Sequence, residues 1–289
     1  MEKTYTFSFL REQDIPELHD TFHTAFSDYM VPIKLTREDF AMKIKREGIQ
    51  LTFCVGAYFG QKLVGFVLTG IGEWLGKPTA YNAGTGVVPE HRSNRLTQRI
   101  YAQMLPKLRE SGIEQCLLEV IQENTAALKA YQTIGFEITR SLDCFRGPKE
   151  QLLLPSEVPK HISTKKAVKP NWGAYEEFCD IHPTWQNTKQ AYKLSPDRKL
   201  VLEAYSEGEL LVGYAAFFPR TGAVAQLAVQ QGFRNRGVAT ALLQEVVHLT
   251  EAPALMVLNV DTACPDMIEL MARRHLTRIL GQYEMLLPL

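Results

Sequence analysis

A pattern of arginines and small residues occurs twice in this chain, roughly half a chain apart. Residues 87–97, VVPEHRSNRLT, align without gaps with residues 229–239, VQQGFRNRGVA. Upstream of these two stretches a second pair of segments also matches, Leu63–Phe66 with Leu211–Tyr214. Because the similarity extends beyond a single loop, the sequence predicts a tandem repeat of one domain.

Chain length supports the same interpretation. With 289 residues the chain is near the upper limit for a single hydrophobic core, so two domains of ordinary size are expected. A stretch with four prolines, from Pro148 to Pro170, has weak periodicity and is typical of a linker. We therefore expect an N-terminal domain at 1–148, a linker at 149–169 and a C-terminal domain at 170–289.

Charge and hydropathy exclude several classes of partner. Lys plus Arg and Asp plus Glu each number 32, so no net charge would attract nucleic acid or an anionic membrane, and any anion site must be local. No apolar run approaches the roughly 20 residues that a membrane helix needs. The first residues lack the basic and apolar regions of a secretory signal, so a cytoplasmic protein is expected. The oligomeric state is not indicated.

Hydrophobic periodicity predicts alternating strands and helices, hence a mixed α/β fold. In the first half we expect strands near residues 4–10, 51–58, 62–69, 81–88, 115–121 and 136–145, and helices near 14–26, 94–110 and 124–134. The second half repeats this order, with strands near residues 200–205, 209–218, 224–229, 254–260 and 282–289 and helices near 172–178, 235–250 and 266–275.

Each arginine-containing loop follows a buried strand and precedes an amphipathic helix. The first unpaired N–H groups of such a helix, together with the positive end of its dipole, form an anion site. Small residues are needed where the backbone itself contacts a phosphate, and the second copy supplies Gly237 and Ala239. The first copy has Arg95 and Thr97 there, and a left-handed Arg95 would cost about 1–2 kcal/mol. Taken alone, either loop is more commonly a surface turn.

The segment that follows the first loop changes this weighing. After the next strand, residues 124–136 read Asn-x-x-Ala-x-x-x-Tyr-x-x-x-Gly-Phe. Together, the loop and this segment resemble the GNAT superfamily of N-acetyltransferases over Thr85–Phe136. The resemblance implies two tandem GNAT-like domains, each a mixed central sheet with helices on both faces. It also implies that acetyl-CoA is the co-substrate, with its pyrophosphate at the loop and its pantetheine between two separated parallel strands.

By this resemblance, Asn124 contacts the pantetheine and Tyr131 is the general acid that protonates the CoA thiolate. Seven residues separate them, which places both on one face of a helix. A phenol with a pKa near 10 keeps its proton at neutral pH. The amide of Val88 is expected to stabilise the oxyanion. Two simpler interpretations stay open, in which Asn124 only caps the helix and Tyr131 is only a core aromatic.

Further site residues follow from the same pattern. Glu119, on the strand beside the expected acetyl site, could be the general base or simply a buried, hydrogen-bonded carboxylate. The expected cofactor contacts in the first copy are Val87, Val88, Arg92, Ser93, Asn94, Arg95, Leu96, Thr97 and Asn124. The candidates in the second copy are Val229, Arg234, Arg236, Gly237 and Ala239.

The second copy departs from the pattern downstream of its loop. Alignment puts Met271 where Tyr131 stands and Cys264 where Asn124 stands, and neither replaces a phenol or an amide. We therefore expect the chemistry in the N-terminal copy. No metal site is expected: His19 and His23 have the i, i+4 spacing of a ligand pair, but no third ligand is nearby, so an ordinary helix face is favoured.

The resulting hypothesis is an N-acetyltransferase that moves an acetyl group from acetyl-CoA to a primary amine in a direct ternary complex. The acceptor would be a small molecule or a peptide. The alternative is a non-catalytic acyl-CoA-binding or sensing protein whose C-terminal copy is the ligand site. A generic nucleotide binder is disfavoured because the chain lacks the Gly-rich loop with Lys-Ser/Thr that such proteins use.

Overall fold

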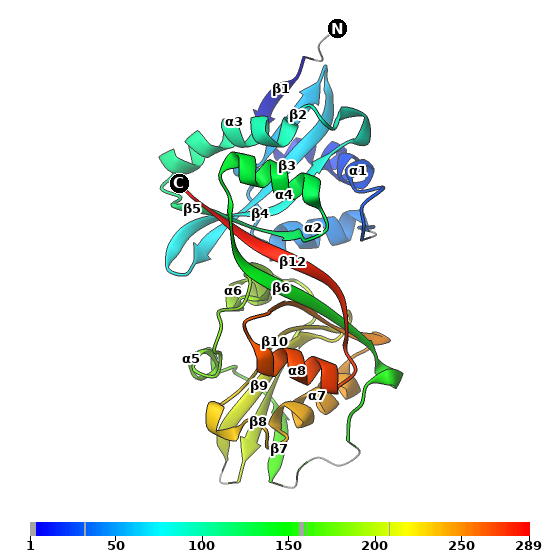
Figure 1. Ribbon diagram of the computed structural model, residues 1–289, viewed down its shortest axis with the longest axis vertical. Coiled ribbons are helices and arrows are strands. Elements are labelled where there is room, and N and C mark those ends of the chain that lie inside the picture. The colour runs from blue at the N-terminus through cyan, green and yellow to red at the C-terminus, as the bar shows by residue number, and fades with distance from the viewer. Residues whose placement is uncertain (1–3, 32, 156–158, 160, 208) are drawn as a thin grey trace. The chain divides into compact units, whose positions relative to one another are not determined.

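The computed structural model describes residues 4–31, 33–155, 159, 161–207 and 209–289 (Figure 1). The chain folds into two compact units. Unit 1 consists of residues 1–139 together with Tyr283–Leu289, and unit 2 consists of Arg140–Gln282. Both are mixed α/β structures, as predicted. Each unit is considered by itself below.

The elements of unit 1 follow the predicted order, with one added helix. Its sheet has the strand order β1-β2-β3-β4-β5-β12, where β12 (Thr277–Pro288) is the last strand of the chain. β4 and β5 are parallel, and the pairs from β1 to β4 are antiparallel. The elements are β1 (Thr6–Phe9), α1 (Ile15–Ala25), α2 (Arg37–Arg46), β2 (Val55–Phe59), β3 (Lys62–Trp74), β4 (Lys77–Val87), α3 (Leu96–Glu110), β5 (Gln115–Ile121) and α4 (Thr125–Ile134).

Helices cover both faces of the unit 1 sheet. On one face α3 and α4 enclose a core that includes Val64, Ile100 and Leu118. On the other face Phe22 of α1 packs against Phe40 of α2 and Phe66 of β3. This two-sided cover is the expected architecture, and it leaves the sheet itself as the frame that positions the candidate site.

Unit 2 repeats the arrangement with the strand order β6-β11-β10-β9-β8-β7. Helix α7 covers one face, and the short helices α5 and α6 supply an aromatic cluster on the other, with Tyr175, Tyr192 and Tyr214 buried. The elements are β6 (Glu137–Pro148), β7 (Ile162–Lys166), α5 (Trp172–Glu176), α6 (Lys189–Leu194), β8 (Leu200–Ser206), β9 (Leu210–Phe218), β10 (Ala223–Val229), α7 (Val238–Leu249), β11 (Ala254–Asp261), α8 (Pro265–Arg273) and β12 (Thr277–Pro288).

The last strands of the two repeats are exchanged. β6, which ends the first repeat, pairs antiparallel with β11 in unit 2, with Leu255 opposite Gly147. β12, which ends the second repeat, extends into unit 1, where the Leu289 N–H donates to the Glu114 carbonyl at 2.8 Å. Met285 belongs to the unit 1 core. The compact units therefore differ from the expected division at 148 and 170.

The expected linker at 149–169 is also more structured than its composition indicates. It contains β7, which pairs with β8 and places Ile162 in the unit 2 core. Residues 156–158 and 160 of this stretch lie outside the described residues. β7 was not predicted because only one of its five residues is buried, so it lacks the alternation of a half-buried strand.

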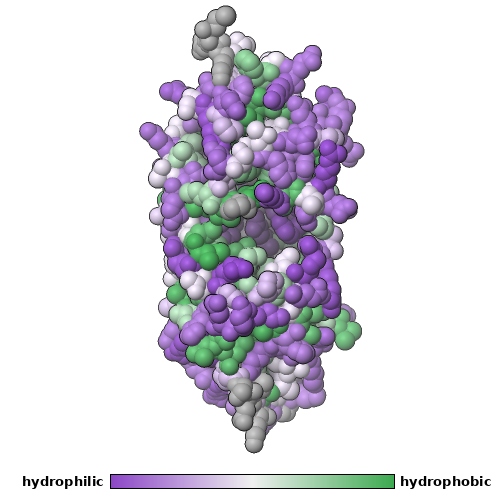
Figure 2. All heavy atoms as spheres, turned by 90° about the vertical axis from the view of Figure 1, so that its right-hand side faces the viewer, coloured by the Kyte–Doolittle hydropathy of each residue, from purple (hydrophilic) through white to green (hydrophobic). Residues whose placement is uncertain are grey.

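Figure 2 shows one face on which hydrophilic residues predominate and hydrophobic residues form smaller groups. Within the described part of the chain, no helix is both long and apolar enough to cross a membrane.

Candidate functional site

The central parallel strands of unit 1 separate toward their carboxyl ends. β4 and β5 are in register over Thr79–Tyr81 and Gln115–Leu117, yet β4 continues to Val87 and β5 to Ile121. β10 and β11 of unit 2 behave alike: Ala223–Val224 pair with Met256–Val257, and both strands then run on. In open α/β sheets, ligands bind beyond the carboxyl ends of strands where the sheet opens in this way.

The two arginine-containing loops have the same backbone conformation. Each begins with a short 3-10 turn, η3 (Pro89–His91) or η6 (Gln231–Phe233). Left-handed residues follow at equivalent places: Ser93 (φ 65°) and Arg95 (φ 53°) in the first loop, Asn235 (φ 60°) and Gly237 (φ 84°) in the second. Arg95 and Gly237 are the N-cap residues of α3 and α7, and neither makes a side-chain cap. The first loop thus keeps this geometry without glycine.

The first arginine of each loop is bound within the protein. Arg92 donates to both carboxylate oxygens of Asp28 at 2.6 and 2.7 Å and to the Val87 carbonyl at 3.2 Å. Its guanidinium lowers the pKa of the Asp28 carboxyl. Arg234 has the equivalent partner in Asp180, at 2.7 Å. Arg92 therefore ties the loop to the segment after α1. An anion at this loop would have the backbone N–H groups of α3 as its donors, because this guanidinium is already engaged.

Tyr131 lies in a buried polar cluster at the place where β4 and β5 separate. Asn82 Nδ2 donates to the hydroxyls of Thr85 (2.8 Å), Tyr101 (2.9 Å) and Tyr131 (3.3 Å). Tyr131 is 7% exposed. Burial raises the pKa of its phenol, and hydrogen bonds from Thr85 and Asn82 oppose that rise. The phenol is therefore protonated throughout the neutral range, as a general acid must be.

Asn124 has the capping role that the sequence left open. Its side-chain oxygen accepts from the Ala127 N–H at 3.2 Å and so caps α4. The same side chain hydrogen-bonds Tyr29. Burial raises the pKa of Tyr29, and the hydrogen bond to Asn124 partly opposes that rise. Tyr29, from the segment after α1, also interacts electrostatically with Tyr131. Sequence reasoning missed Tyr29, because nothing local links it to a helix a hundred residues away.

The amide of Val88 is not available for the expected oxyanion contact. Its N–H donates to the Val64 carbonyl at 2.9 Å as part of the β3–β4 ladder. In an antiparallel pair, successive residues point their N–H groups to opposite sides. Val87 stands opposite Gly65 in the alternate, non-bonded position, so its N–H points toward the separated strand β5. Of these two residues, Val87 is therefore the candidate for an oxyanion contact in the proposal below.

Glu119 lies on β5 within the separated part of the strand. Its carboxylate accepts from the Tyr81 hydroxyl at 2.6 Å. Its neighbours Leu118 and Val120 belong to the core that contains Tyr131, so Glu119 faces the opposite side of the sheet.

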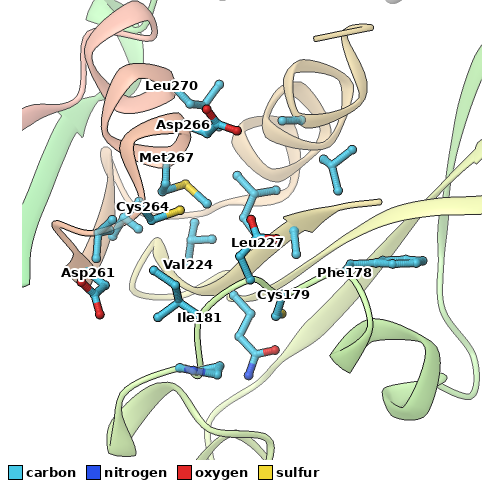
Figure 3. Close-up of a pocket in the computed structure, with 18 of the residues that line it drawn as sticks. Phe178, Cys179, Ile181, Val224, Leu227, Asp261, Cys264, Asp266, Met267 and Leu270 are labelled. Atoms are coloured by element: carbon cyan, nitrogen blue, oxygen red, sulfur yellow. The ribbon is translucent and has the colours of Figure 1, made fainter. Parts of the chain in front are cut away.

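Unit 2 contains a cleft of about 560 Å³ at the equivalent place. Figure 3 shows Cys264, Met267 and Leu270 at α8 lining it together with Val224 and Leu227 of β10. The candidate residues Val229, Arg234, Gly237 and Ala239 are also among its lining residues. Apolar side chains and the polar residues of the loop both line this cleft.

The cleft of unit 2 has no counterpart of the phenol. Met271 is fully buried in α8 at the place that Tyr131 has in α4. Cys264 is the N-cap of α8, as Asn124 is of α4, but it makes no side-chain cap. The alignment made from the sequence therefore agrees with the positions of these residues in the two helices.

We expect Gly237→Ala to destabilise unit 2 by about 1–2 kcal/mol, because an alanine must adopt a left-handed conformation there. An added Cβ would also lie 2.4 Å from Cγ of Pro159. Gly232→Ala in the same loop is the control, since its Cβ meets no described atom within 4 Å and its φ is not positive. Urea unfolding of both variants measures the difference, and equal midpoints would contradict the steric argument.

Comparison with known protein families gives one family. The model of the acetyltransferase (GNAT) family matches residues 14–136 and again residues 167–275, one segment for each copy. The sequence matches no curated protein.

Solved structures share the fold along almost the whole chain. A glucosamine N-acetyltransferase region of a fungal multi-domain GH3 β-N-acetylglucosaminidase has a TM-score of 0.77 at 15% identity, covering 99% of this chain and 38% of that one. A GCN5-related N-acetyltransferase from Sphaerobacter thermophilus has a TM-score of 0.75 at 17% identity, covering 98% of this chain and 95% of that one. A tandem GNAT protein from the clavulanic acid biosynthesis pathway has a TM-score of 0.72 at 14% identity, covering 99% of this chain and 98% of that one. At these identities the likeness concerns the fold alone.

Proposed function

Because this chain belongs to the GNAT acetyltransferase family, we propose that it transfers an acetyl group from acetyl-CoA to a primary amine, and that the chemistry takes place in unit 1. One observation carries the choice of unit. The Tyr131 hydroxyl lies in the polar cluster where β4 and β5 separate, whereas fully buried Met271 has the equivalent place in unit 2. The acceptor is a small molecule or a peptide that carries the amine.

Acetyl-CoA would bind first at the loop before α3. The unpaired N–H groups of Leu96 and Thr97 at the helix N-terminus favour the diphosphate. Each such interaction contributes about 0.3–1 kcal/mol when exposed and up to ~2 when partly buried, so several together offset the left-handed Arg95. Asn94 supports the loop by donating to the His91 and Arg92 carbonyls at 3.0 and 2.9 Å. The pantetheine then passes between β4 and β5, beside Asn124.

Acetyl transfer needs one proton delivered and one removed. The acceptor nitrogen attacks the thioester carbonyl, and the developing oxyanion accepts from the Val87 N–H. When the C–S bond breaks, Tyr131 gives its proton to the sulfur. The attacking nitrogen loses its extra proton to Glu119, directly or through water. Glu119 then releases this proton to solvent, and solvent returns a proton to Tyr131.

The two proton-transfer groups lie on opposite faces of the sheet. Tyr131 belongs to the face covered by α3 and α4, and Glu119 points to the face covered by α1 and α2. Donor and acceptor could thus approach the opening between the strands from different sides and meet there. This arrangement supports a direct ternary complex, because both substrates can be bound together.

The cleft of unit 2 supports a second candidate function, binding of an acyl-CoA without chemistry. Its volume of about 560 Å³ and its glycine-containing loop favour a ligand, while Met271 supplies no proton. In this case unit 2 would be a sensing or storage site. The two candidates do not exclude each other, since each unit has its own loop.

A matched pair of substitutions decides which loop holds the diphosphate. Thr97→Asp and Ala239→Asp place a carboxylate in the first turn of α3 and of α7, at equivalent positions. An acidic residue there stabilises the free helix by about 0.3–1 kcal/mol, so both variants should fold. At an effective dielectric of about 20, a carboxylate about 5 Å from a phosphate charge repels it by roughly 3 kcal/mol, on the order of 100-fold in affinity.

We expect Thr97→Asp to weaken acetyl-CoA binding in calorimetry and to lower kcat/KM by about 100-fold, while Ala239→Asp keeps the activity. Loss of binding and activity only in Ala239→Asp would move the function to unit 2. Two binding events in the wild type, with one lost in each variant, would show that both loops hold the coenzyme.

A further inference from the structure

Three ligand-type atoms converge at the C-terminal half of α1. His19 and His23 lie one turn apart on α1 and direct their Nε2 atoms to the carbonyl oxygen of Leu35. We propose that His19, His23 and the Leu35 carbonyl bind a divalent transition-metal ion of the Zn²⁺ type, with solvent completing the coordination.

Two of the three distances within this triangle are those between ligands that share one ion, and the distance from His23 Nε2 to the Leu35 oxygen is slightly shorter. The two Nε2 atoms are 3.2 Å apart, and they lie 3.0 Å (His19) and 2.7 Å (His23) from the Leu35 oxygen. Ligand atoms about 2.0–2.2 Å from a metal, at octahedral to tetrahedral angles, are about 2.8–3.5 Å apart. An ion above the triangle would contact all three atoms with little movement of the side chains.

Hydrogen bonds alone satisfy the two Nε2 atoms and the Leu35 oxygen less well than a metal ion would. The Leu35 oxygen only accepts, so a neutral His23 must use its N–H at Nε2 to donate to it. If His19 carries its proton on Nδ1, its Nε2 and the Leu35 oxygen are two acceptors 3.0 Å apart. If His19 carries its proton on Nε2, its Nδ1 cannot donate to the Asp20 carboxylate. A cation at the centre would be shared by all three lone pairs.

The surroundings of His19 are typical of a ligating imidazole. Its Nδ1 lies 3.4 Å from the Asp20 carboxylate, on the side of the ring opposite to Nε2. Such a carboxylate partner fixes the tautomer in which Nε2 carries the lone pair for a metal. The ring packs edge-on against Phe40, and its side chain is only 12% exposed, which limits its rotation.

The sequence did not predict this site because its third ligand is a backbone carbonyl twelve residues beyond His23. Within the described residues no group of three or more His, Cys, Asp or Glu side chains could hold a metal, so the main chain is what completes the triad. Two imidazoles favour Zn²⁺, Cu²⁺ or Ni²⁺ over Mg²⁺ or Ca²⁺, which prefer oxygen ligands. A bound ion would tie the segment before α2 to α1.

The test is a titration of the full chain, freed of metal with a chelator, with Zn²⁺ in a calorimeter. We expect one site in the wild type, at least tenfold weaker in His19→Gln and in His23→Gln. His248→Gln, which removes an exposed histidine of α7, is the matched control and should bind as the wild type does. Asp20→Asn keeps both imidazoles and should weaken binding by a smaller factor than either histidine substitution does.

Co²⁺ provides a second readout that does not depend on the folding of a variant. A site of nitrogen and oxygen ligands gives weak visible bands, whereas a cysteine ligand adds an intense thiolate charge-transfer band. Weak bands alone in the wild type would support the proposal. A thiolate band, the absence of a stoichiometric site, or binding that survives in both histidine variants would overturn it, and none of these results bears on the acetyl site.

Discussion

Tyr131→Phe is expected to lower kcat by roughly 10²–10⁴-fold, with the affinity for acetyl-CoA nearly unchanged. The substitution removes the only atom of the side chain that can protonate the leaving thiolate, and it keeps the ring that packs against Phe136. Pre-steady-state and steady-state assays with an amine acceptor measure kcat, and calorimetry measures the affinity. Turnover equal to that of the wild type would remove Tyr131 from the mechanism.

Tyr101→Phe is the matched control for this experiment. Tyr101 is also buried, and its hydroxyl also accepts a hydrogen bond from Asn82, at 2.9 Å. Its loss disturbs the same polar cluster without removing the proposed acid, so we expect a cost in stability of about 1–3 kcal/mol and only a small change in kcat. If both variants lose activity equally, the cluster as a whole matters and proton donation by Tyr131 is not what the assay reports.

The pH dependence gives an independent check on the same residue. Burial raises the pKa of Tyr131 above the ordinary value of 10.0, so the phenol stays protonated up to and beyond pH 10. The stability that comes from keeping it neutral is present below the pKa of the unfolded chain, and it is lost as the pH rises toward the folded value. The alkaline fall of kcat that belongs to Tyr131 should therefore lie above pH 10, and a fall near neutral pH would belong to another group.

The order of the elements could be predicted from sequence because it depends on local periodicity. The strand at Gln115–Ile121 and the helix that follows Asn124 have the predicted ends, since apolar spacing and a capping residue specify them. α2 was missed for the same reason, because it buries only Phe40 and six of its ten residues are charged. A helix with one buried residue has no stripe from which to recognise it.

The geometry of the first loop shows how far such local reasoning reaches. The alignment of Arg95 with Gly237 suggested a left-handed backbone, and Arg95 has it at φ 53°. The hydrogen-bond partner of the Val88 N–H could not be predicted from the sequence, because a change of register by one residue reverses which N–H faces the neighbouring strand. The cluster of Asn82, Thr85 and Tyr101 was missed because it unites residues of two elements that pair only in three dimensions.

Strand exchange was not predictable, since β6 and β12 are the corresponding strands of two copies of one pattern. Each could pair with β5 or with β11 and satisfy the same alternation of buried and exposed residues. The structure pairs β6 with β11 and brings the end of β12 into unit 1. The consequence is that the last residues of the chain stabilise the first unit.

Substitutions near the end of the chain should therefore destabilise different units. Met285→Ala and Met271→Ala each remove a fully buried methionine from the last twenty residues or so of the chain, and each should cost about 2–5 kcal/mol. Met285 belongs to the core of unit 1, together with Ile100 of α3, and Met271 to that of unit 2, together with Leu242 of α7. We expect Met285→Ala to loosen unit 1 and Met271→Ala to loosen unit 2.

Hydrogen exchange of the two equivalent helices distinguishes them. Met285→Ala should speed amide exchange in α3 and leave α7 protected, and Met271→Ala should do the opposite, because exchange follows the stability of the local cooperative unit. If the domains instead followed the contiguous division at residue 170, both methionines would lie in the C-terminal domain and both variants would expose α7. Protection of α3 in Met285→Ala would therefore contradict the exchange of strands, and with it the view that the proposed acetyl site in unit 1 depends on the end of the chain.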